Sequence, residues 1–364
     1  MPLDHYVTLG RSGLRVSPFC LGAMTFGEDW GFGSTVPEAE AIMARYFERG
    51  GNFLDTANGY TGGHSERIIG NFIAHDRARR DEIVIATKFF SNLSRRNPNG
   101  GGASRKAVVA SCEQSLRRLR TDYIDLYWMH VWDRFTPIEE TMRALDDLVR
   151  AGKVRYIGFS DTPAWKVSQA QVTALFRGWT PLVALQIEYS LLERTVEGEL
   201  VPMALELGLG ITPWSPIAGG VLSGKFRRED AATATSDRGV RALSRLTERT
   251  FTILDEVARV ASELNTTPAA VALAWVQSRA GVASTIIGAR RLDQLDANLA
   301  AVDLRLSPAH IQVLDAASAP VLSFPAAFLS GAVNFMHNGL TVNGVPSEAM
   351  ALLQPSPHAL DQGG

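Results

Sequence analysis

The sequence has few cysteines and no marked excess of charge of either sign. Its 364 residues include two cysteines, Cys20 and Cys112, and the formal net charge at pH 7 is −2. Two cysteines in a chain of this length do not make a disulfide framework, and they indicate a reducing compartment. The nearly balanced charge gives no electrostatic reason to expect nucleic acid or an anionic membrane as a partner.

Long apolar runs are also missing. No stretch approaches the roughly 18 uninterrupted apolar residues that a membrane-spanning helix needs. The N-terminal residues MPLDHYVTLG contain no basic segment followed by an apolar run, so no secretory signal is predicted. We therefore expect a cytoplasmic protein without membrane contacts. No feature of the sequence indicates an oligomeric state.

Several common cofactor motifs are absent as well. The chain has no G-x-G-x-x-G, so a nicotinamide cofactor would not use a Rossmann site. No group of Cys and His residues has zinc spacing, and we expect no metal. Gly219–Lys225, GGVLSGK, resembles a phosphate-binding P-loop, but Phe226 stands where the loop needs a magnesium-binding hydroxyl. Nucleotide hydrolysis is therefore not predicted.

Short apolar segments recur along the chain with helical segments between them. After an expected hairpin of Val7–Leu9 and Leu14–Val16, eight such segments are predicted strands: Phe19–Met24, Asn52–Leu54, Ile83–Thr87, Tyr123–Met129, Val154–Phe159, Leu182–Ile187, Gly210–Trp214 and Ala283–Ile287. The predicted helices include Pro37–Arg49, Lys106–Leu119 and Ile138–Val149, and a helix capped by Thr267 with Pro268 in its first turn.

Strands that are buried on both faces and separated by helices form a parallel sheet. Eight such units favour a closed (β/α)8 TIM barrel over an open doubly wound sheet, although spacing alone does not separate the two. We expect residues 1–318 to form this barrel. The periodicity stops near Ala319, and we expect residues 319–364 to form a C-terminal extension over the barrel mouth. Residues 217–246 are a predicted insertion after the seventh strand.

Four side chains fall at the carboxyl ends of consecutive predicted strands. Asp55 follows the second strand, Tyr60 lies in the next loop, Lys88 ends the third strand and His130 ends the fourth. In a barrel of this kind the carboxyl ends of the strands carry the catalytic groups. Taken singly, Asp55 also fits a helix cap, Lys88 a strand-end lysine and His130 a core histidine.

Together the four side chains suit proton delivery to an oxygen atom. A tyrosine with a pKa of about 10 is a slow acid at neutral pH, and we expect the ammonium of Lys88 to lower the pKa of Tyr60. Asp55 would keep Lys88 protonated, and His130 would orient a carbonyl oxygen by a hydrogen bond.

Three segments carry a family resemblance: NFLDTANGY at residues 52–60, the lysine in VIATKF and the histidine in DLYWMH. They resemble the aldo-keto reductase family, and the likeness runs from the GRSGLRVSPFCLGAMTFG opening to about Leu304. It implies a (β/α)8 barrel and hydride transfer between NADPH and a carbonyl compound. It assigns the catalytic tetrad to Asp55, Tyr60, Lys88 and His130, with Tyr60 as the general acid.

The same resemblance implies a cofactor site. Ser160, Asp161 and Gln186 would hold the carboxamide, with Asp161 standing where relatives usually have Asn, and Trp214 would stack on the nicotinamide ring. Arg290 would read the 2′-phosphate of NADPH, although Arg290 and Arg291 also fit solvated surface arginines. The remaining residues assigned to the cofactor are Thr25, Asp55, Ser215, Ile217, Gly219, Lys225, Gly288, Gln294 and Asn298.

Aromatic residues near the predicted mouth are expected to contact a small-molecule carbonyl substrate. These are Trp30, Phe89 and Trp132, and packing within loops is an equal alternative. The motifs WSPIAGGVLSGKF and the Gly-rich loop resemble the aryl-alcohol dehydrogenase and potassium-channel β-subunit branch of the family. Two alternatives to a carbonyl reductase therefore stay open: a cofactor-binding regulatory subunit, and a dehydrogenase that oxidises an alcohol or sugar.

Overall fold

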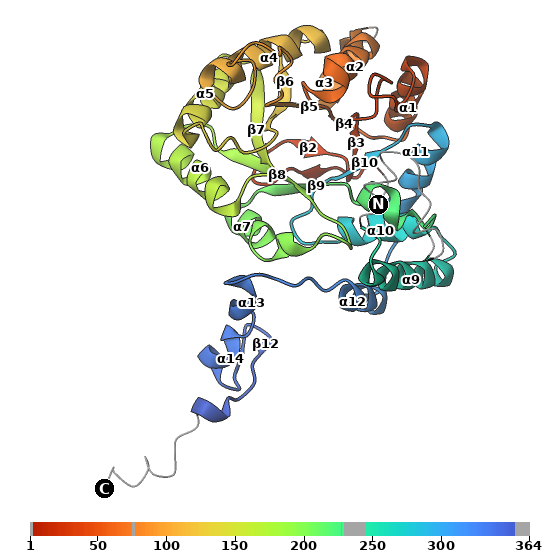
Figure 1. Ribbon diagram of the computed structural model, residues 1–364, viewed down its shortest axis with the longest axis vertical. Coiled ribbons are helices and arrows are strands. Elements are labelled where there is room, and N and C mark those ends of the chain that lie inside the picture. The colour runs from red at the N-terminus through yellow and green to blue at the C-terminus, as the bar shows by residue number, and fades with distance from the viewer. Residues whose placement is uncertain (1–2, 75–76, 227, 229–244, 354–364) are drawn as a thin grey trace.

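The computed structural model describes residues 3–74, 77–226, 228 and 245–353 of the chain. Its main body is a parallel sheet of eight strands surrounded by helices (Figure 1). The sheet order is β10-β3-β4-β5-β6-β7-β8-β9. The strands are β3 (Phe19–Gly22), β4 (Phe53–Asp55), β5 (Val84–Phe89), β6 (Ile124–Met129), β7 (Val154–Ser160), β8 (Leu182–Glu188), β9 (Gly210–Trp214) and β10 (Thr285–Gly288).

The two edges of this sheet approach each other just before β10. Ile211 of β9 donates its backbone N–H to the carbonyl of Gly281 at 2.8 Å, and Ala283 donates to the carbonyl of Ile211 at 2.9 Å. These bonds bring the eight strands into a nearly closed ring. The (β/α)8 barrel predicted from the sequence is confirmed, and all eight predicted strands are present.

Helices cover the outside of the ring (Figure 1). Thr267 caps α10 as predicted, by accepting from the N–H of Ala270, and Thr35 caps α1 in a capping box with Glu38, so that α1 begins one residue before the predicted start. The helices are α1 (Val36–Glu48), α2 (His64–Ala74), α3 (Arg77–Glu82), α4 (Arg105–Leu119), α5 (Ile138–Arg150), α6 (Ala164–Arg177), α7 (Leu200–Leu207), α9 (Glu248–Glu263), α10 (Pro268–Gln277), α11 (Leu292–Leu299) and α12 (Pro308–Ala317).

Short 3-10 helices lie in several loops: η1 (Tyr60–Gly63), η2 (Thr195–Glu197), η3 (Ala218–Ser223), η5 (Ala300–Asp303) and η6 (Ala351–Leu353). The predicted insertion at residues 217–246 begins with η3, and residues 227 and 229–244 of it lie outside the described residues. None of the helices described is long and apolar enough to cross a membrane.

The N-terminal hairpin closes one end of the barrel. Strands β1 (Val7–Thr8) and β2 (Arg15–Val16) pair antiparallel, and Leu9 is completely buried against the barrel interior. Gly10 has φ +57°, and a Cβ there would lie 2.2 Å from the carbonyl oxygen of Val183, so this tight approach requires glycine. Because Val183 lies near the start of β8, the hairpin covers the amino ends of the strands. The described residues place no such hairpin over the carboxyl ends.

The C-terminal extension departs from the expected placement. It comprises α13 (Ala326–Leu329), α14 (Ala332–His337), β11 (Thr341–Val342) and β12 (Val345–Pro346). Figure 1 shows it leaving the barrel below α7 and running outward. The expectation that it lies over the barrel mouth is therefore corrected. Its side chains are mostly exposed. The sequence of the extension therefore has no burial periodicity from which its position could be predicted.

Candidate active site

The four candidate catalytic residues meet at the open, carboxyl end of the barrel. Asp55 is the last residue of β4, Lys88 is the penultimate residue of β5 and His130 follows β6 directly. Tyr60 begins η1 in the loop after β4. Parallel pairing aligns Asp55 with Ala86 and Lys88 with Trp128, so these strand ends stand side by side.

Lys88 is the centre of the arrangement and is completely buried. Its Nζ donates to the hydroxyl of Tyr60 at 3.1 Å and to the backbone carbonyl of Thr56 at 2.9 Å, and it forms a close ion pair with Asp55. These contacts use all three protons of the ammonium group. These contacts exclude the alternative that Lys88 is a strand-end lysine whose amine extends into solvent. Asp55 acts as the partner of Lys88 and caps no helix.

For both Lys88 and Tyr60, burial and the neighbouring charges shift the pKa in opposite directions. Burial alone would lower the pKa of Lys88, but the Asp55 carboxylate and the Tyr60 hydroxyl outweigh it, and the pKa lies above its ordinary value. Burial raises the pKa of Tyr60, and the charge of Lys88 lowers it only in part. Lys88 thus acts on the Tyr60 pKa in the expected direction, but burial has the larger effect and the pKa lies above its ordinary value. Tyr60 is protonated at neutral pH.

His130 completes the group as a neutral side chain. Burial, with the charge of Lys88, lowers the pKa of His130 to about 3. Its ring meets the Tyr60 ring edge-on, with centroids 5.7 Å apart and planes at 80°. A neutral imidazole carries one N–H that can donate to an oxygen atom.

Two polar side chains on β7 and β8 stand next to the tetrad. Ser160 and Gln186 are paired in the sheet register, and Gln186 Nε2 donates to Asp55 at 3.1 Å. The Ser160 hydroxyl is buried beside the Asp161 carboxylate without hydrogen-bonding geometry to any residue of the described chain. A buried hydroxyl without a partner costs free energy. It fits a position that a polar group of a ligand, such as an amide, would satisfy.

Asp161 and Trp214 line one side of the mouth. Trp214 Nε1 donates to Asp161 Oδ1 at 3.0 Å, and Asp161 adopts φ +42°. Burial raises the pKa of Asp161 despite the bond from Trp214. Both residues border a cavity of about 370 Å³ that also contacts Thr162, Ile187 and Glu188. The indole of Trp214 is held by Asp161, a contact that the sequence prediction did not include.

The loop after β9 has an unusual backbone. Ser215, Ala218 and Gly219 have φ values of +54°, +49° and +67°, and Ser215 Oγ accepts from the N–H of Gly219 at 3.1 Å. The carbonyl of Ile217 accepts from the next turn of η3. The N–H groups of Ala218 and Gly219 both donate to Ser215 within this turn. A Cβ on Gly219 would meet no described atom within 4 Å, so the loop leaves room for a ligand. Lys225 lies nearby, and its Nζ is 5.2 Å from the centroid of the Phe226 ring.

The turn between β10 and α11 is held by side chains that the family resemblance assigns to the cofactor. Gln294 Oε1 accepts from the backbone N–H of Arg290 at 3.0 Å, and Asn298 Nδ2 donates to the carbonyl of Gly288 at 3.1 Å. Thr25 Oγ1 donates to the carbonyl of Ala289 at 3.2 Å. These three side chains therefore shape the turn. A Cβ placed on Gly288 would have no described atom within 4 Å apart from those of the glycine and its chain neighbours.

The two neighbouring arginines at this turn differ. Arg291 pairs with Asp293 at 3.0 Å and is exposed. Arg290 is partly buried, and its guanidinium makes no ion pair with any residue that the structure describes. Of the two arginines, Arg290 is the one without an ion pair to a described residue, and it can meet an anionic ligand.

The aromatic residues expected at the substrate side separate into two groups. The Trp30 ring meets the Tyr60 ring edge-on at 6.3 Å, and the Trp132 ring meets that of Trp165 at 5.6 Å. Phe89 is completely buried and packs against Tyr127 at 5.0 Å, so its assignment to substrate binding is corrected. Alternation along a strand explains this, because Lys88 points into the barrel and its neighbour must point toward the helices.

Two residues at this site were missed in the sequence. Trp165 lies in the first turn of α6 and contacts Trp132, and only the fold brings it to the mouth. Thr56 contributes a backbone carbonyl to Lys88, which no side-chain pattern could indicate.

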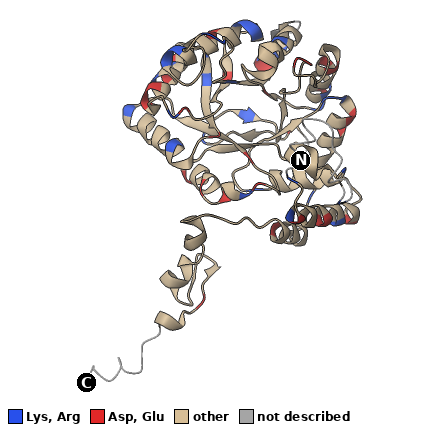
Figure 2. Ribbon diagram, in the orientation of Figure 1, with Lys and Arg blue, Asp and Glu red and all other residues tan. Residues whose placement is uncertain are grey.

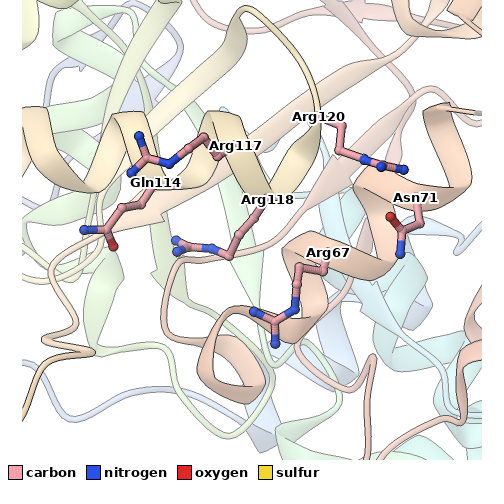
Figure 3. A pocket seen from close by; sticks show the side chains of 6 residues that line it. All are labelled: Arg67, Asn71, Gln114, Arg117, Arg118 and Arg120. Carbon is pink, nitrogen blue, oxygen red and sulfur yellow. The ribbon is translucent and has the colours of Figure 1, made fainter.

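A second cavity, of about 280 Å³, lies between α2 and α4 (Figure 3) and contains none of the tetrad. It is lined by Arg67, Asn71, Gln114, Arg117, Arg118 and Arg120. Among the residues described, no group of three or more His, Cys, Asp or Glu side chains could hold a metal ion.

Comparisons with known proteins agree on one family. The model of the aldo/keto reductase family matches residues 18–319. The chain is 40% identical to an uncharacterized oxidoreductase, YrpG, of Bacillus subtilis, over 85% of this chain and 95% of the relative. It is 38% identical to norsolorinic acid reductase B of Aspergillus parasiticus, over 91% and 88%. It is 35% identical to a putative aryl-alcohol dehydrogenase of Saccharomyces cerevisiae, over 87% of each. The chain therefore belongs to the aldo/keto reductase family and is an oxidoreductase.

Proposed function

We propose that this chain reduces an aldehyde or ketone to an alcohol with NADPH, and that Tyr60 supplies the proton. The observation that carries the proposal is the contact between Lys88 and the Tyr60 hydroxyl at 3.1 Å, beside a neutral His130. A protonated acid next to a fixed positive charge and a neutral hydrogen-bond donor is suited to an oxygen that gains negative charge.

Each member of the tetrad has one task in this mechanism. A bound nicotinamide cofactor supplies the hydride for the carbonyl carbon. Tyr60 gives its hydroxyl proton to the carbonyl oxygen, and the ammonium of Lys88 stabilises the phenolate that remains. Asp55 keeps Lys88 charged, and the N–H of His130 orients the carbonyl oxygen. In the reverse direction the Tyr60 phenolate accepts the proton of an alcohol.

The residues around the tetrad fit a nicotinamide cofactor. The buried hydroxyl of Ser160, without hydrogen-bonding geometry to any described residue, and the amide of Gln186 suit a carboxamide group. The loop of Ser215 to Gly219 suits a pyrophosphate because it leaves open space at Gly219 and has the positive charge of Lys225 beside it. Arg290 suits the additional phosphate of NADPH, since a guanidinium binds phosphate by charge-assisted hydrogen bonds.

Aromatic carbonyl compounds are the proposed substrates. Trp30 places aromatic surface beside Tyr60, and Trp132, in the loop that follows His130, pairs with Trp165; flat rings pack well on such surfaces. Two relatives are named for norsolorinic acid and for aryl alcohols. An aryl alcohol is the reduced form of an aromatic aldehyde or ketone.

The test follows NADPH oxidation by absorbance with a panel of aromatic aldehydes and ketones, including nitrobenzaldehyde. We expect turnover, with a loss of about 10²- to 10⁴-fold in kcat for Tyr60→Phe. Tyr6→Phe is the matched control, because Tyr6 lies on the hairpin at the closed end of the barrel. Tight NADPH binding without turnover above the Tyr60→Phe level would favour the regulatory-subunit alternative. Faster reaction of alcohols with NADP⁺ would favour the oxidative one.

A further inference from the structure

The C-terminal extension exposes an unusual amount of apolar surface. Residues 319–353 contain one charged side chain, Glu348, whereas 20% of the whole chain is charged, and Figure 2 shows the contrast with the helices of the barrel. The exposed large apolar side chains of the extension are Val321, Phe324, Phe328, Leu329, Phe335, Met336, Leu340, Val342, Val345, Leu352 and Leu353. Soluble monomers rarely expose contiguous apolar surface on this scale.

The extension has a defined internal structure. Asn334 Oδ1 accepts from the N–H of Glu348 at 2.9 Å, and Asn338 Oδ1 accepts from that of Met350 at 2.8 Å. Ser347 Oγ accepts from the N–H of Gly339 at 2.9 Å. These bonds join α14 to the segment that follows β12. The apolar side chains are therefore presented on a folded unit.

The barrel carries a second apolar surface that faces outward on α6. Val167, Ala170 and Ala174 point inward and are buried, yet Trp165, Val172, Leu175 and Phe176 on the same helix are 58%, 59%, 65% and 84% exposed. A helix that is apolar on both faces is typical of a helix that is covered on both sides. Leu205 of α7, which packs beside α6, is also 49% exposed. We call these five exposed side chains the α6–α7 patch.

The extension and the α6–α7 patch lie on the same side of the molecule. Arg249 Nη2 donates to the carbonyls of Ser318 and Ala319 and fixes the root of the extension. Ala326 lies against Gly198, just before α7, where an added Cβ would come within 3.3 Å of it. Figure 1 shows the extension leaving beneath α7, the neighbour of α6. A two-fold axis on this side would place the extension of each copy against the patch of the other.

We propose that two copies of this chain form a dimer in which each extension packs on the α6–α7 patch of its partner. A stable interface buries roughly 800 Å² on each partner. A phenylalanine offers about 150–250 Å², so Phe324, Phe328 and Phe335, which are 81%, 62% and 51% exposed, supply about half of that area on the extension. The other apolar side chains of the extension supply the rest.

The first test measures the mass of the full chain in solution. We expect sedimentation at micromolar concentration to give twice the 39.5 kDa of the chain, and we expect Phe176→Asp or Phe335→Asp to weaken the dimer at least tenfold. Phe135→Asp is the matched control, because Phe135 is as exposed as Phe176 but lies in the loop after β6. A monomeric full chain, or a dimer that Phe176→Asp and Phe335→Asp leave unchanged, overturns the proposal.

The second test distinguishes exchange between copies from contact within one copy. Both native cysteines are buried, so cysteines introduced at exposed positions react selectively. Phe176→Cys and Phe335→Cys chains are mixed, allowed to exchange and oxidised. We expect a disulfide-linked pair in the mixture at a higher yield than in either variant alone. A disulfide that forms only inside one chain, in the doubly substituted variant, would show that the extension folds back on its own barrel and would overturn the proposal.

Discussion

The ammonium of Lys88 contacts the hydroxyl of Tyr60 at 3.1 Å, and the lysine is completely buried. A buried cation is tolerated only with a partner of opposite charge, and Asp55 supplies that charge. The same pair therefore contributes to the stability of the barrel and to the chemistry at its mouth. The two contributions can be separated by substitution.

Replacing Lys88 by methionine is expected to destabilise the fold. Lys88→Met leaves the Asp55 carboxylate buried with the Gln186 amide as its remaining partner, and the free energy of unfolding should fall by roughly 3–5 kcal/mol. The double variant Asp55→Asn, Lys88→Met removes both charges and should recover a large part of the loss. Urea denaturation measures both values. An equal loss in the single and double variants would refute the charge explanation.

Substitution of His130 should change how stability depends on pH. The pKa of His130 is about 3 in the fold and about 6.5 in an unfolded chain. The unfolded state thus binds more protons below pH 6.5, and stability falls as the pH falls from there toward 3. At pH 5 the loss from this residue is roughly 2 kcal/mol relative to pH 7.

His130→Gln should remove that part of the pH dependence. Denaturation at pH 7 and pH 5 measures it, and the variant should lose less stability than the parent chain by about the stated amount. His5→Gln is the control, because His5 is exposed near the N-terminus. Identical pH profiles for the parent chain and His130→Gln would contradict the depressed pKa.

Ser160→Ala should have opposite effects on stability and on cofactor binding. Its hydroxyl is buried and has no hydrogen-bonding geometry to any residue that the structure describes, so its removal should leave the stability of the chain without NADPH unchanged or raise it. NADPH affinity should fall roughly threefold to tenfold, the worth of one hydrogen bond. Thermal denaturation and fluorescence titration measure the two effects. Thr87→Val is the contrasting control, since the Thr87 hydroxyl donates to Glu66 at 2.7 Å and its loss should destabilise the fold.

The neighbouring arginines after β10 provide a matched pair for cofactor preference. Arg290→Ala should weaken NADPH binding by about 10- to 100-fold, the value of a hydrogen bond to a charged group, and should leave NADH binding nearly unchanged. Arg291→Ala should have a smaller effect because Asp293 already neutralises Arg291. Fluorescence titration with both cofactors gives the four constants. Equal losses for NADPH and NADH in Arg290→Ala would show that the 2′-phosphate is not read there.

The strands and the meeting of the tetrad could be predicted because both follow local rules. Apolar periodicity located all eight strands, and parallel pairing then placed Asp55, Lys88 and His130 at adjacent ends. The direction of the Tyr60 pKa could not be predicted, because it depends on the balance of burial and charge in three dimensions. Phe89 was misassigned although strand alternation, applied to Lys88, excludes it from the mouth. The course of the extension could not be predicted, since few of its side chains are buried against the barrel.

The hairpin of β1 and β2 gives the molecule a closed base. Since Gly10 lies against the start of β8 and the tetrad lies beyond the far ends of the strands, the hairpin and the reacting groups are on opposite sides of the barrel. A surface that captures the protein by a tag on its N-terminus would hold it with the mouth turned toward the solution. Protein immobilised in this way should keep full access to its substrate. The closed end of the barrel is therefore a suitable attachment point for immobilised assays.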